Sequence, residues 1–247
     1  MGTSADRLRE YYARTASGYD VHEADPEHLA ALRVALPLLA AHGVRRVLDV
    51  GCGTGKAMRA VEAAIPGAEA VGIDPSPDLL AVARDRHGHP TDRLHEGVGE
   101  ALPFPDGVFD AALAVAVLHH VPDPWAVVAE MRRVAPIVVI SDANRYGQGR
   151  APIRAVKLAL RALGLAAAID RRRNGPDRHF ESEGDGVAWP FSVFDLVARL
   201  RSLGDEVMVV PTRGTPAMHA FPLGAATHAL LVSFLPGALD SVQSPPN

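Results

Sequence analysis

Short runs of β-branched residues alternate with amphipathic helical patterns between residues 46 and 142. This alternation is typical of a parallel sheet whose strands are joined by crossover helices. The pattern predicts strands at 46–50, 70–73, 93–98, 109–117 and 137–141, and helices at 56–64, 77–85 and 124–134. Pro77 and Pro124 suit the first turn of a helix, where the missing N–H breaks no hydrogen bond, so they indicate where two of these helices begin.

Further elements flank this block on both sides. We expect a helix at about 27–42, one apolar helix around 153–169, a helix at 193–203, and two last strands at 206–210 and 227–234. The tail at 236–247 contains several Pro and Ser residues and is expected to fray. No internal repeat is visible. We therefore expect a single domain over 1–247, divided into an N-terminal segment and helix (1–45), a core (46–142), an insert (143–205), the last two strands (206–235) and the tail.

Composition narrows the class of protein. With 48% hydrophobic residues and a net charge of −4 over 247 residues, the chain can bury a core, which excludes wholesale disorder. Acidic residues outnumber basic ones, so charge predicts no nucleic-acid partner. Cys52 is the only cysteine, which excludes an intrachain disulfide and a cysteine-built zinc site and favours a cytoplasmic location. The chain opens on no leader-like segment, and its most apolar stretch, 223–239, is interrupted by polar residues, so neither secretion nor a membrane is expected.

The strongest local signal is a buried strand that runs into a glycine turn and then a helix, VLDVGCGTG at 47–55. Glycines allow a left-handed backbone there and let the chain approach a ligand closely. A phosphate-binding P-loop would need glycine at 50 and Ser or Thr at 57, where Val50 and Ala57 stand. A nicotinamide-dinucleotide loop would need glycine at 56, where Lys56 stands. Cys52 within this turn is interpreted as a small packed residue and not a nucleophile.

Asp74 is the acidic partner of this loop. It follows Gly55 by 19 residues and ends the next predicted strand. A carboxylate at that place can accept two hydrogen bonds from a ribose diol. Together with the observed glycine spacing, it predicts an adenosine-type ligand without a tightly held pyrophosphate.

Four motifs in this order resemble the class I S-adenosylmethionine (SAM)-dependent methyltransferases. They are VLDVGCGTG at 47–55, Asp74, EALPFPDGVFD at 100–110 and VLHHV at 117–121. Within that class, the chain is similar to small-molecule enzymes related to the ubiquinone and menaquinone biosynthesis methyltransferases (methyltransferase type 11), over about residues 10–142. The resemblance implies an α/β fold: a Rossmann-like, seven-stranded mixed sheet with the last strand antiparallel, helices on both faces and a helical lid. The core at 46–142 would bind SAM, and 1–45 and 143–205 would supply the lid.

The resemblance also implies the cofactor, SAM, with S-adenosylhomocysteine (SAH) as its product. Asp49 would orient the glycine turn or meet the ammonium of SAM through water, Asp74 would bind the ribose hydroxyls, and Pro75 would pack beside the adenine. The full set assigned to SAM lies at the glycine loop, at the ends of neighbouring strands and on the N-terminal segment: Asp49, Gly51, Cys52, Gly53, Gly55, Asp74, Pro75, Gly99, Glu100, Ala101, Val117, Leu118, Tyr11 and Tyr19.

Two features depart from the family pattern. Relatives usually carry an aspartate that accepts from the adenine amino group, and Val98 stands there instead. The usual Lys-Pro-Gly-Gly turn before the fifth strand is contracted to three residues, 134–136. Tyr11, Tyr12 and Tyr19 resemble the segment that closes over SAM, with aromatic staples of a surface helix as the alternative interpretation.

Methyl transfer needs alignment and exclusion of water, and it uses a base only where the nucleophile must lose a proton. The candidates for catalysis are His119 and His120, expected at the end of the fourth strand with only one side chain facing the pocket, and Tyr19. Substrate-binding candidates follow the fifth strand or lie in the lid insert: Asp142, Asn144, Trp189 and Phe191. No metal is expected. The arginines at 171–173 and Arg178 are interpreted as a solvated turn.

The predicted activity is therefore transfer of a methyl group to an O, N or C nucleophile of a small, partly aromatic metabolite, as in natural-product biosynthesis. Two alternatives stay open at this point: a SAM-binding cyclase or isomerase that transfers no methyl group, and an RNA or DNA methyltransferase. The acidic balance and the lack of an Asn-Pro-Pro-Tyr-type motif disfavour the second. A small-molecule acceptor is the expected partner, and a homodimer is a candidate assembly.

Overall fold

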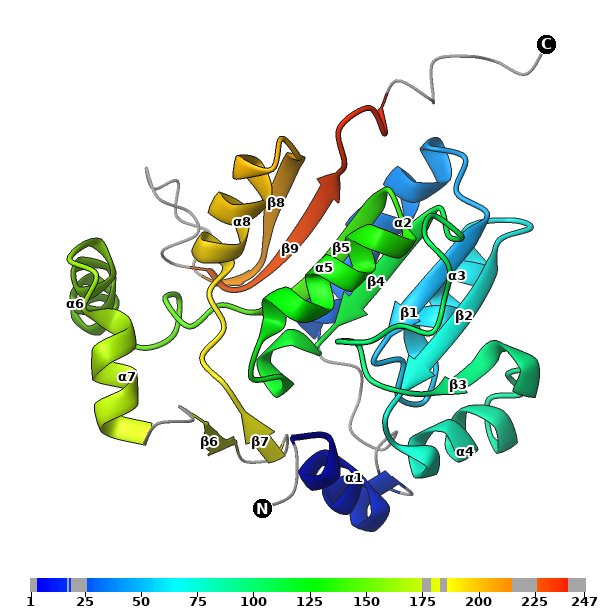
Figure 1. Ribbon diagram of the computed structural model, residues 1–247, viewed down its shortest axis with the longest axis horizontal. Coiled ribbons are helices and arrows are strands. Elements are labelled where there is room, and N and C mark those ends of the chain that lie inside the picture. The colour runs from blue at the N-terminus through cyan, green and yellow to red at the C-terminus, as the bar shows by residue number, and fades with distance from the viewer. Residues whose placement is uncertain are drawn as a thin grey trace.

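A seven-stranded mixed sheet forms the centre of the computed structural model, which describes residues 4–16, 18, 26–174, 179–182, 186–214 and 226–239. The strands run in the order β3-β2-β1-β4-β5-β9-β8 (Figure 1). Their bounds are β1 Arg46–Val50, β2 Glu69–Asp74, β3 Leu94–Glu96, β4 Ala111–Val115, β5 Ile137–Ala143, β8 Glu206–Gly214 and β9 Ala226–Phe234. The five strands from β3 to β5 pair in parallel, whereas β9 is antiparallel to both β5 and β8. The predicted fold class is confirmed.

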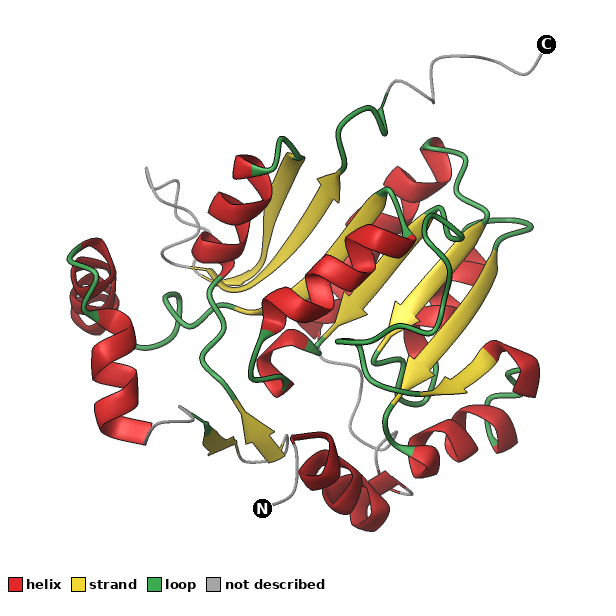
Figure 2. Ribbon diagram, viewed as in Figure 1, coloured by secondary structure: helices red, strands yellow, loops and turns green. Residues whose placement is uncertain are grey.

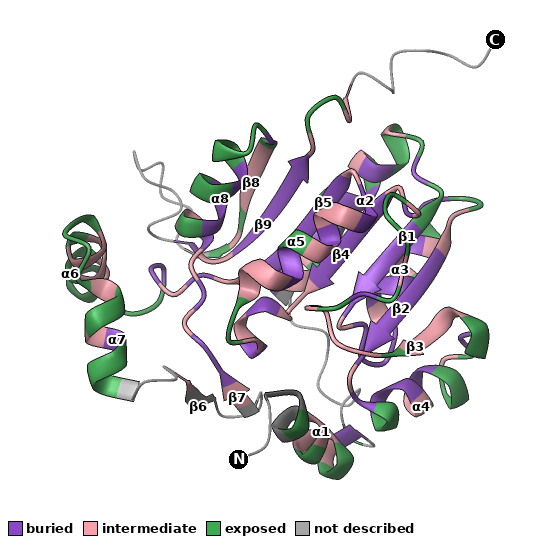
Figure 3. Cartoon of the chain, in the orientation of Figure 1, coloured by how far each residue is buried: buried purple, intermediate pink, exposed green. Residues whose placement is uncertain are grey.

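Helices cover both faces of this sheet, as Figure 2 shows. One apolar cluster joins α5 (Pro124–Val134) and α8 (Val193–Ser202) to one face. A second cluster joins α2 (Pro26–Ala41), α3 (Lys56–Ala64) and part of α4 (Pro77–Asp85) to the other face. The five inner strands, β1, β2, β4, β5 and β9, are buried along nearly their whole length, as expected where a sheet is covered on both sides, whereas the edge strands β3 and β8 are half-buried or exposed (Figure 3).

Local signals placed the core helices correctly. The predicted bounds of α3, α4 and α5 agree with the structure. Ser76 caps α4 by accepting from the Leu79 N–H, and Asp123 caps α5 by accepting from the Trp125 N–H, each directly before the proline that opens the helix.

The insert differs from the prediction. The single helix expected at 153–169 is wrong, because the segment forms α6 (Ala151–Ala162) and α7 (Ala166–Asn174). Gly164 breaks the run with a left-handed backbone, φ +70°, which an α-helix cannot continue through. A small hairpin, β6 (Phe180–Ser182) and β7 (Gly186–Ala188), follows and was not predicted. Helices α6 and α7 stand beside the sheet on the side of β8 and β9 (Figure 1).

The N-terminal helix α1 (Ser4–Thr15) lies near α4 and β7 (Figure 1). Tyr19 and the tail at 240–247 fall outside the described residues. No helix in the described ranges is both long and apolar enough to cross a membrane.

Candidate active site

The glycine turn leaves the carboxyl end of β1 with three left-handed residues, Gly51, Gly53 and Gly55, at φ +69°, +52° and +79°. A Cβ on Gly51 would lie 2.5 Å from a methyl carbon of Val117, so this glycine lets the loop after β4 pack closely. A Cβ on Gly53 would collide with nothing, because its nearest neighbour, Leu79 Cδ1, would be as far away as 3.9 Å. Gly53 therefore preserves open space above the turn, as a ligand cradle requires.

That open space is part of a cavity of about 740 Å³ at the carboxyl edge of the sheet, the usual ligand position in open α/β folds. We call it the first cavity. Of the residues assigned to SAM from the sequence, the cavity is lined by Gly51, Gly53, Asp74, Pro75, Gly99, Glu100 and Val117. Its lining does not include Asp49, Cys52, Gly55, Ala101, Leu118 or Tyr11.

Asp74 closes one side of the first cavity. Its two carboxylate oxygens accept from the Gly53 N–H at 2.9 Å and the Ser76 N–H at 2.8 Å, which ties the end of β2 to the glycine turn. Burial raises the pKa of Asp74 to about 6, although these two hydrogen bonds oppose the rise. Each carboxylate oxygen can accept a second hydrogen bond, so this side chain still has acceptor capacity for a ligand hydroxyl.

Asp49 lies beneath the turn on β1 and is almost completely buried. Its Oδ2 accepts no hydrogen bond from any described residue. Burial and the neighbouring charge of Asp74 raise the pKa of Asp49 to about 8. A ligand that brings positive charge to this edge of the sheet would favour the ionised form of this carboxyl group.

This shift predicts how Asp49 affects stability. The unfolded chain ionises Asp49 near its ordinary pKa, whereas the folded chain keeps it protonated up to about pH 8. The folded state therefore holds the extra proton in this window, and the free energy of unfolding should fall as pH rises from 4 to 8. Asp49→Asn has no ionisable group at this position, so its free energy of unfolding should lack this decrease. Its stability relative to the wild type should therefore increase by on the order of 1 kcal/mol for each pH unit between pH 4 and 8.

Urea unfolding of the ligand-free protein at pH 4.5 and pH 8 measures this difference. Asp78→Asn, at an exposed position on α4, is the control and should follow the wild type at both pH values. An Asp49→Asn protein with the same pH dependence as the wild type would contradict the buried, protonated carboxyl.

Two other residues of the turn are structural. Cys52 is buried, and burial raises the pKa of its thiol well above the ordinary value, so it is a packed residue and not a nucleophile. The Gly55 carbonyl lies 3.1 Å from His89 Nε2, and a Cβ on Gly55 would collide with that ring. His89 braces the turn from the loop after α4, a role that the sequence did not indicate.

The fourth strand ends earlier than predicted, and this moves both histidines. β4 stops at Val115, because Ala116 adopts a left-handed backbone (φ +59°) while its N–H donates to the Ser141 carbonyl. His119 and His120 therefore lie on a 3-10 helix, Leu118–His120, so their expected place on the strand is wrong. Their ring centroids are 4.0 Å apart. A strained alanine at a cavity wall is typical of functional sites.

The two rings line different cavities. His120 lines the first cavity, and its Nδ1 lies 2.9 Å from the Val187 carbonyl of the lid hairpin. His119 lines a second cavity of about 960 Å³. Leu118 lines neither, because its side chain is fully buried in the core.

His119 pairs with Asp142 at the end of β5. His119 Nδ1 lies 2.6 Å from Asp142 Oδ1. The backbone N–H groups of Leu118 and Ala143 donate to the same carboxylate at 2.7 and 2.6 Å. Burial alone would raise the pKa of Asp142, but the facing His119, His28 and the Ala143 N–H hold it below the ordinary value. An ionised carboxylate fixed in this way orients the imidazole.

The second cavity also contains two of the predicted substrate-binding residues, Trp189 and Phe191. The backbone N–H of Trp189 donates to the backbone carbonyl of His119 at 2.7 Å, which connects the insert to the 3-10 helix. Asn144 is placed elsewhere. Its buried side chain donates to the Ala226 carbonyl and lines neither cavity.

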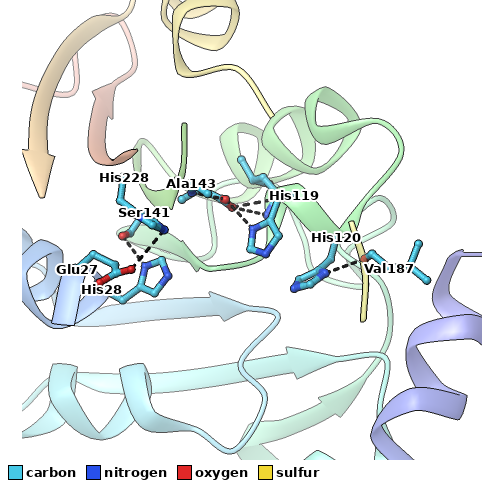
Figure 4. A network of polar contacts seen from close by, with 10 residues as sticks. Glu27, His28, His119, His120, Ser141, Ala143, Val187 and His228 are labelled. Atoms are coloured by element: carbon cyan, nitrogen blue, oxygen red, sulfur yellow. Dashed lines mark hydrogen bonds and ion pairs between the residues drawn. The ribbon is translucent and has the colours of Figure 1, made fainter. Parts of the chain in front are cut away.

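Figure 4 shows a further polar network, in which His28 lies beside Ser141 and Glu27 lies near His228. His28 Nδ1 is 2.9 Å from the Ser141 hydroxyl, and Glu27 Oε1 is 3.4 Å from His228 Nε2. Arg213 donates to the same Glu27 oxygen at 2.7 Å. These residues come from α2, β5, β8 and β9, so no local sequence pattern could bring them together.

Helix α1 reaches the first cavity. Tyr12 lines it and packs edge-on against Tyr11 at 5.1 Å between ring centroids. The Arg9 guanidinium donates to the Pro75 carbonyl at 2.7 Å, beside Asp74. The N-terminal segment therefore contacts the part of the cavity where the acidic partner of the glycine loop lies.

Comparison with known proteins finds a family model that matches part of the chain. Residues 48–136 match the model described as a methyltransferase domain. An uncharacterized methyltransferase of Mycobacterium sp. (strain JLS) is 35% identical over 174 residues, which cover 63% of this chain and 64% of that protein. The chain thus spans just under two thirds of the length of this curated relative.

Solved structures share the fold at low sequence identity. The DhpI–SAM–HEP complex aligns with a TM-score of 0.61 and 20% identity, covering 94% of this chain and 98% of the other. The [4+2]-cyclase SpnF aligns with a TM-score of 0.57 and 18% identity, covering 94% of this chain and 96% of the other. At these identities the likeness concerns the fold.

Proposed function

We propose that this chain, whose residues 48–136 match the methyltransferase-domain model, transfers a methyl group from SAM to a small-molecule acceptor. One observation carries the proposal. The glycine-loop cavity and the cavity beside the His119–Asp142 pair meet at two adjacent histidine rings, His120 lining the first and His119 the second, so a cofactor site and an acceptor site with a positioned base would lie side by side.

The residues of the first cavity suit SAM. Asp74 would accept from the ribose hydroxyls, and the open space at Gly53 would admit the methionine portion. The positive charge of the ligand would favour the ionised form of Asp49, whose Oδ2 accepts no hydrogen bond from a described residue. Glu100 and the neighbouring backbone would meet the adenine, since Val98 has no polar group to offer.

The residues of the second cavity suit proton transfer. When bound, SAM supplies a methyl group on a positively charged sulfur, and its departure leaves neutral SAH. Because ionised Asp142 accepts from Nδ1–H of His119, the basic lone pair of the imidazole is on Nε2. His119 Nε2 would take the proton of an acceptor hydroxyl or amine as the new bond forms, and Asp142 would stabilise the resulting imidazolium.

Trp189 and Phe191 would form the wall against which a planar or apolar acceptor packs. The residues leave the methylated atom, O, N or C, undetermined. The similarity to quinone-biosynthesis methyltransferases stays a prediction. A SAM-dependent reaction without methyl transfer is the second candidate, favoured only by the fold shared with a [4+2]-cyclase.

Mass spectrometry of reactions with SAM separates these functions. The protein is incubated with SAM and a panel of small hydroxylated and aminated aromatic compounds. Methyl transfer predicts a product heavier by one CH₂ unit together with an equal amount of SAH. A product of unchanged mass without SAH would instead identify the cyclase or isomerase, and calorimetry that detects neither SAM nor SAH binding would reject both.

A further inference from the structure

We propose that the acceptor carries an anionic group, a carboxylate or a phosphate, and that Lys157 and Arg173 bind this group in the second cavity. The proposal rests on the proposed function, because it names the substrate class of the same site. It starts from the charges of this cavity, which the sequence analysis did not connect with the site.

Lys157 is held in place by the backbone of the loop after β5. Its Nζ donates to the Arg145 carbonyl at 2.9 Å and to the Gln148 carbonyl at 3.1 Å. An ammonium group has three N–H donors, so the two carbonyls position the charge and leave one donor for a ligand. Lys157 is one of only two lysines in the chain.

The cavity has an excess of positive charge. Its charged lining residues among those described are Arg145, Lys157, Arg173 and Asp170. Arg145 and Asp170 form a two-pronged ion pair with both guanidinium Nη groups on the carboxylate, one of them at 2.6 Å. This pair is neutral, so among the described charged residues that line the cavity no acidic side chain is left to balance Lys157 and Arg173.

The pKa of Lys157 is consistent with this imbalance. Burial lowers it, and the nearby charges of Arg145 and Arg173 lower it further, against the opposing effect of Asp170. Crowded cations in a partly buried cavity are what a bound anion would stabilise.

The expected turn at 171–173 is wrong, because all three arginines lie in the last helical turn of α7; they are exposed, as expected, and Arg178 lies outside the described residues. Arg171 and Arg172 are exposed and line neither cavity, whereas Arg173, although it is also exposed, lines the second cavity and an adjoining apolar groove. The groove, about 830 Å³ between α6 and α7, includes Ile153 and Leu160.

Lys157 and Arg173 are shared by the two hollows, and His119 lines only the second. An acceptor that fits this arrangement has its anionic group at the junction, beside α6 and α7 (Figure 1), and its nucleophile toward His119.

Binding measurements on the SAH-loaded protein test this inference. Benzoate and phenyl phosphate are the anionic probes, and benzamide is the neutral probe of the same shape. We expect the better anion to bind roughly tenfold tighter than benzamide, the effect of one charge-assisted hydrogen bond. The order of the two anions distinguishes a carboxylate site from a phosphate site.

The Lys157→Met/Arg173→Gln variant should lose this preference, while Arg172→Gln, the exposed neighbour on α7, should keep it. Equal affinity for benzoate, phenyl phosphate and benzamide in the wild type, or a preference that survives in the double variant, would overturn the proposal. SAH binding to the double variant, measured in the same titration series, shows that the protein is folded.

Failure of this inference is distinguishable from failure of the proposed function. If SAH binds and the anion preference is absent, only the substrate class is rejected. If SAH does not bind to the wild type, the proposed function is rejected, and titrating the probes without SAH still decides whether the cavity selects anions.

Discussion

Replacing Asp74 by alanine should weaken the binding of SAH about 100-fold, or roughly 3 kcal/mol, because two charge-assisted hydrogen bonds to the ribose hydroxyls would be lost. Among the described residues that line the first cavity, Glu100 is the only other acidic one. It lies after β3 and not on β2, so we expect it not to replace the hydrogen bonds of Asp74. Isothermal titration calorimetry at pH 7.5, above the pKa of about 6, measures the loss.

Two controls separate binding from folding. Asp74 also accepts from the backbone N–H groups of Gly53 and Ser76, so alanine leaves these donors unsatisfied. Asp74→Asn keeps the shape and one acceptor and should lose part of the affinity with less effect on the melting temperature. Asp78→Ala, at an exposed position on α4, should bind SAH like the wild type. An Asp74→Ala protein that is folded and binds SAH within twofold of the wild type would refute the role of Asp74.

Replacing His119 by glutamine should lower kcat by a factor of about 100 to 10,000, the usual contribution of a general base, while SAH affinity stays unchanged. Asp142→Asn should also lower kcat, because an amide at this place no longer selects the tautomer with its lone pair on Nε2. The rate of SAH formation with a saturating acceptor measures both effects.

The pH profile adds a readout that a purely structural role would not change. In the wild type kcat should rise with pH as His119 loses its proton, and in His119→Gln this rise should disappear. His87→Gln is the control, because His87 lies on the loop after α4 and lines neither cavity. Retained activity in His119→Gln combined with a large loss in His120→Gln would show that His120, and not His119, is the base.

Local chemistry explains which parts of the fold could be predicted from the sequence. The strand, glycine turn and helix at 46–64 follow one another directly, and prolines open α4 and α5, so these bounds depend only on neighbouring residues. The turn at Gly164 was missed because a lone glycine within an apolar helical pattern is compatible with one long helix.

The candidate site was harder to predict because its geometry depends on contacts between distant segments. Ala116 takes a conformation that glycine usually adopts, and nothing in its side chain indicates this. That residue ends β4 and turns His119 toward Asp142, which is 23 residues later in the chain. The glycine loop and its partner Asp74 could therefore be recognised from their spacing, whereas the pairing of His119 with Asp142 and the division into two cavities required the structure.

The most direct test of the account is a crystal structure of this chain with SAH bound. The account predicts that the ribose hydroxyls lie within hydrogen-bond distance of Asp74, that the homocysteine portion lies over Gly53, and that the sulfur is directed toward His119 and the cavity lined by Trp189. SAH bound away from the carboxyl edge of β1, β2 and β4, or with its sulfur turned away from His119, would contradict it.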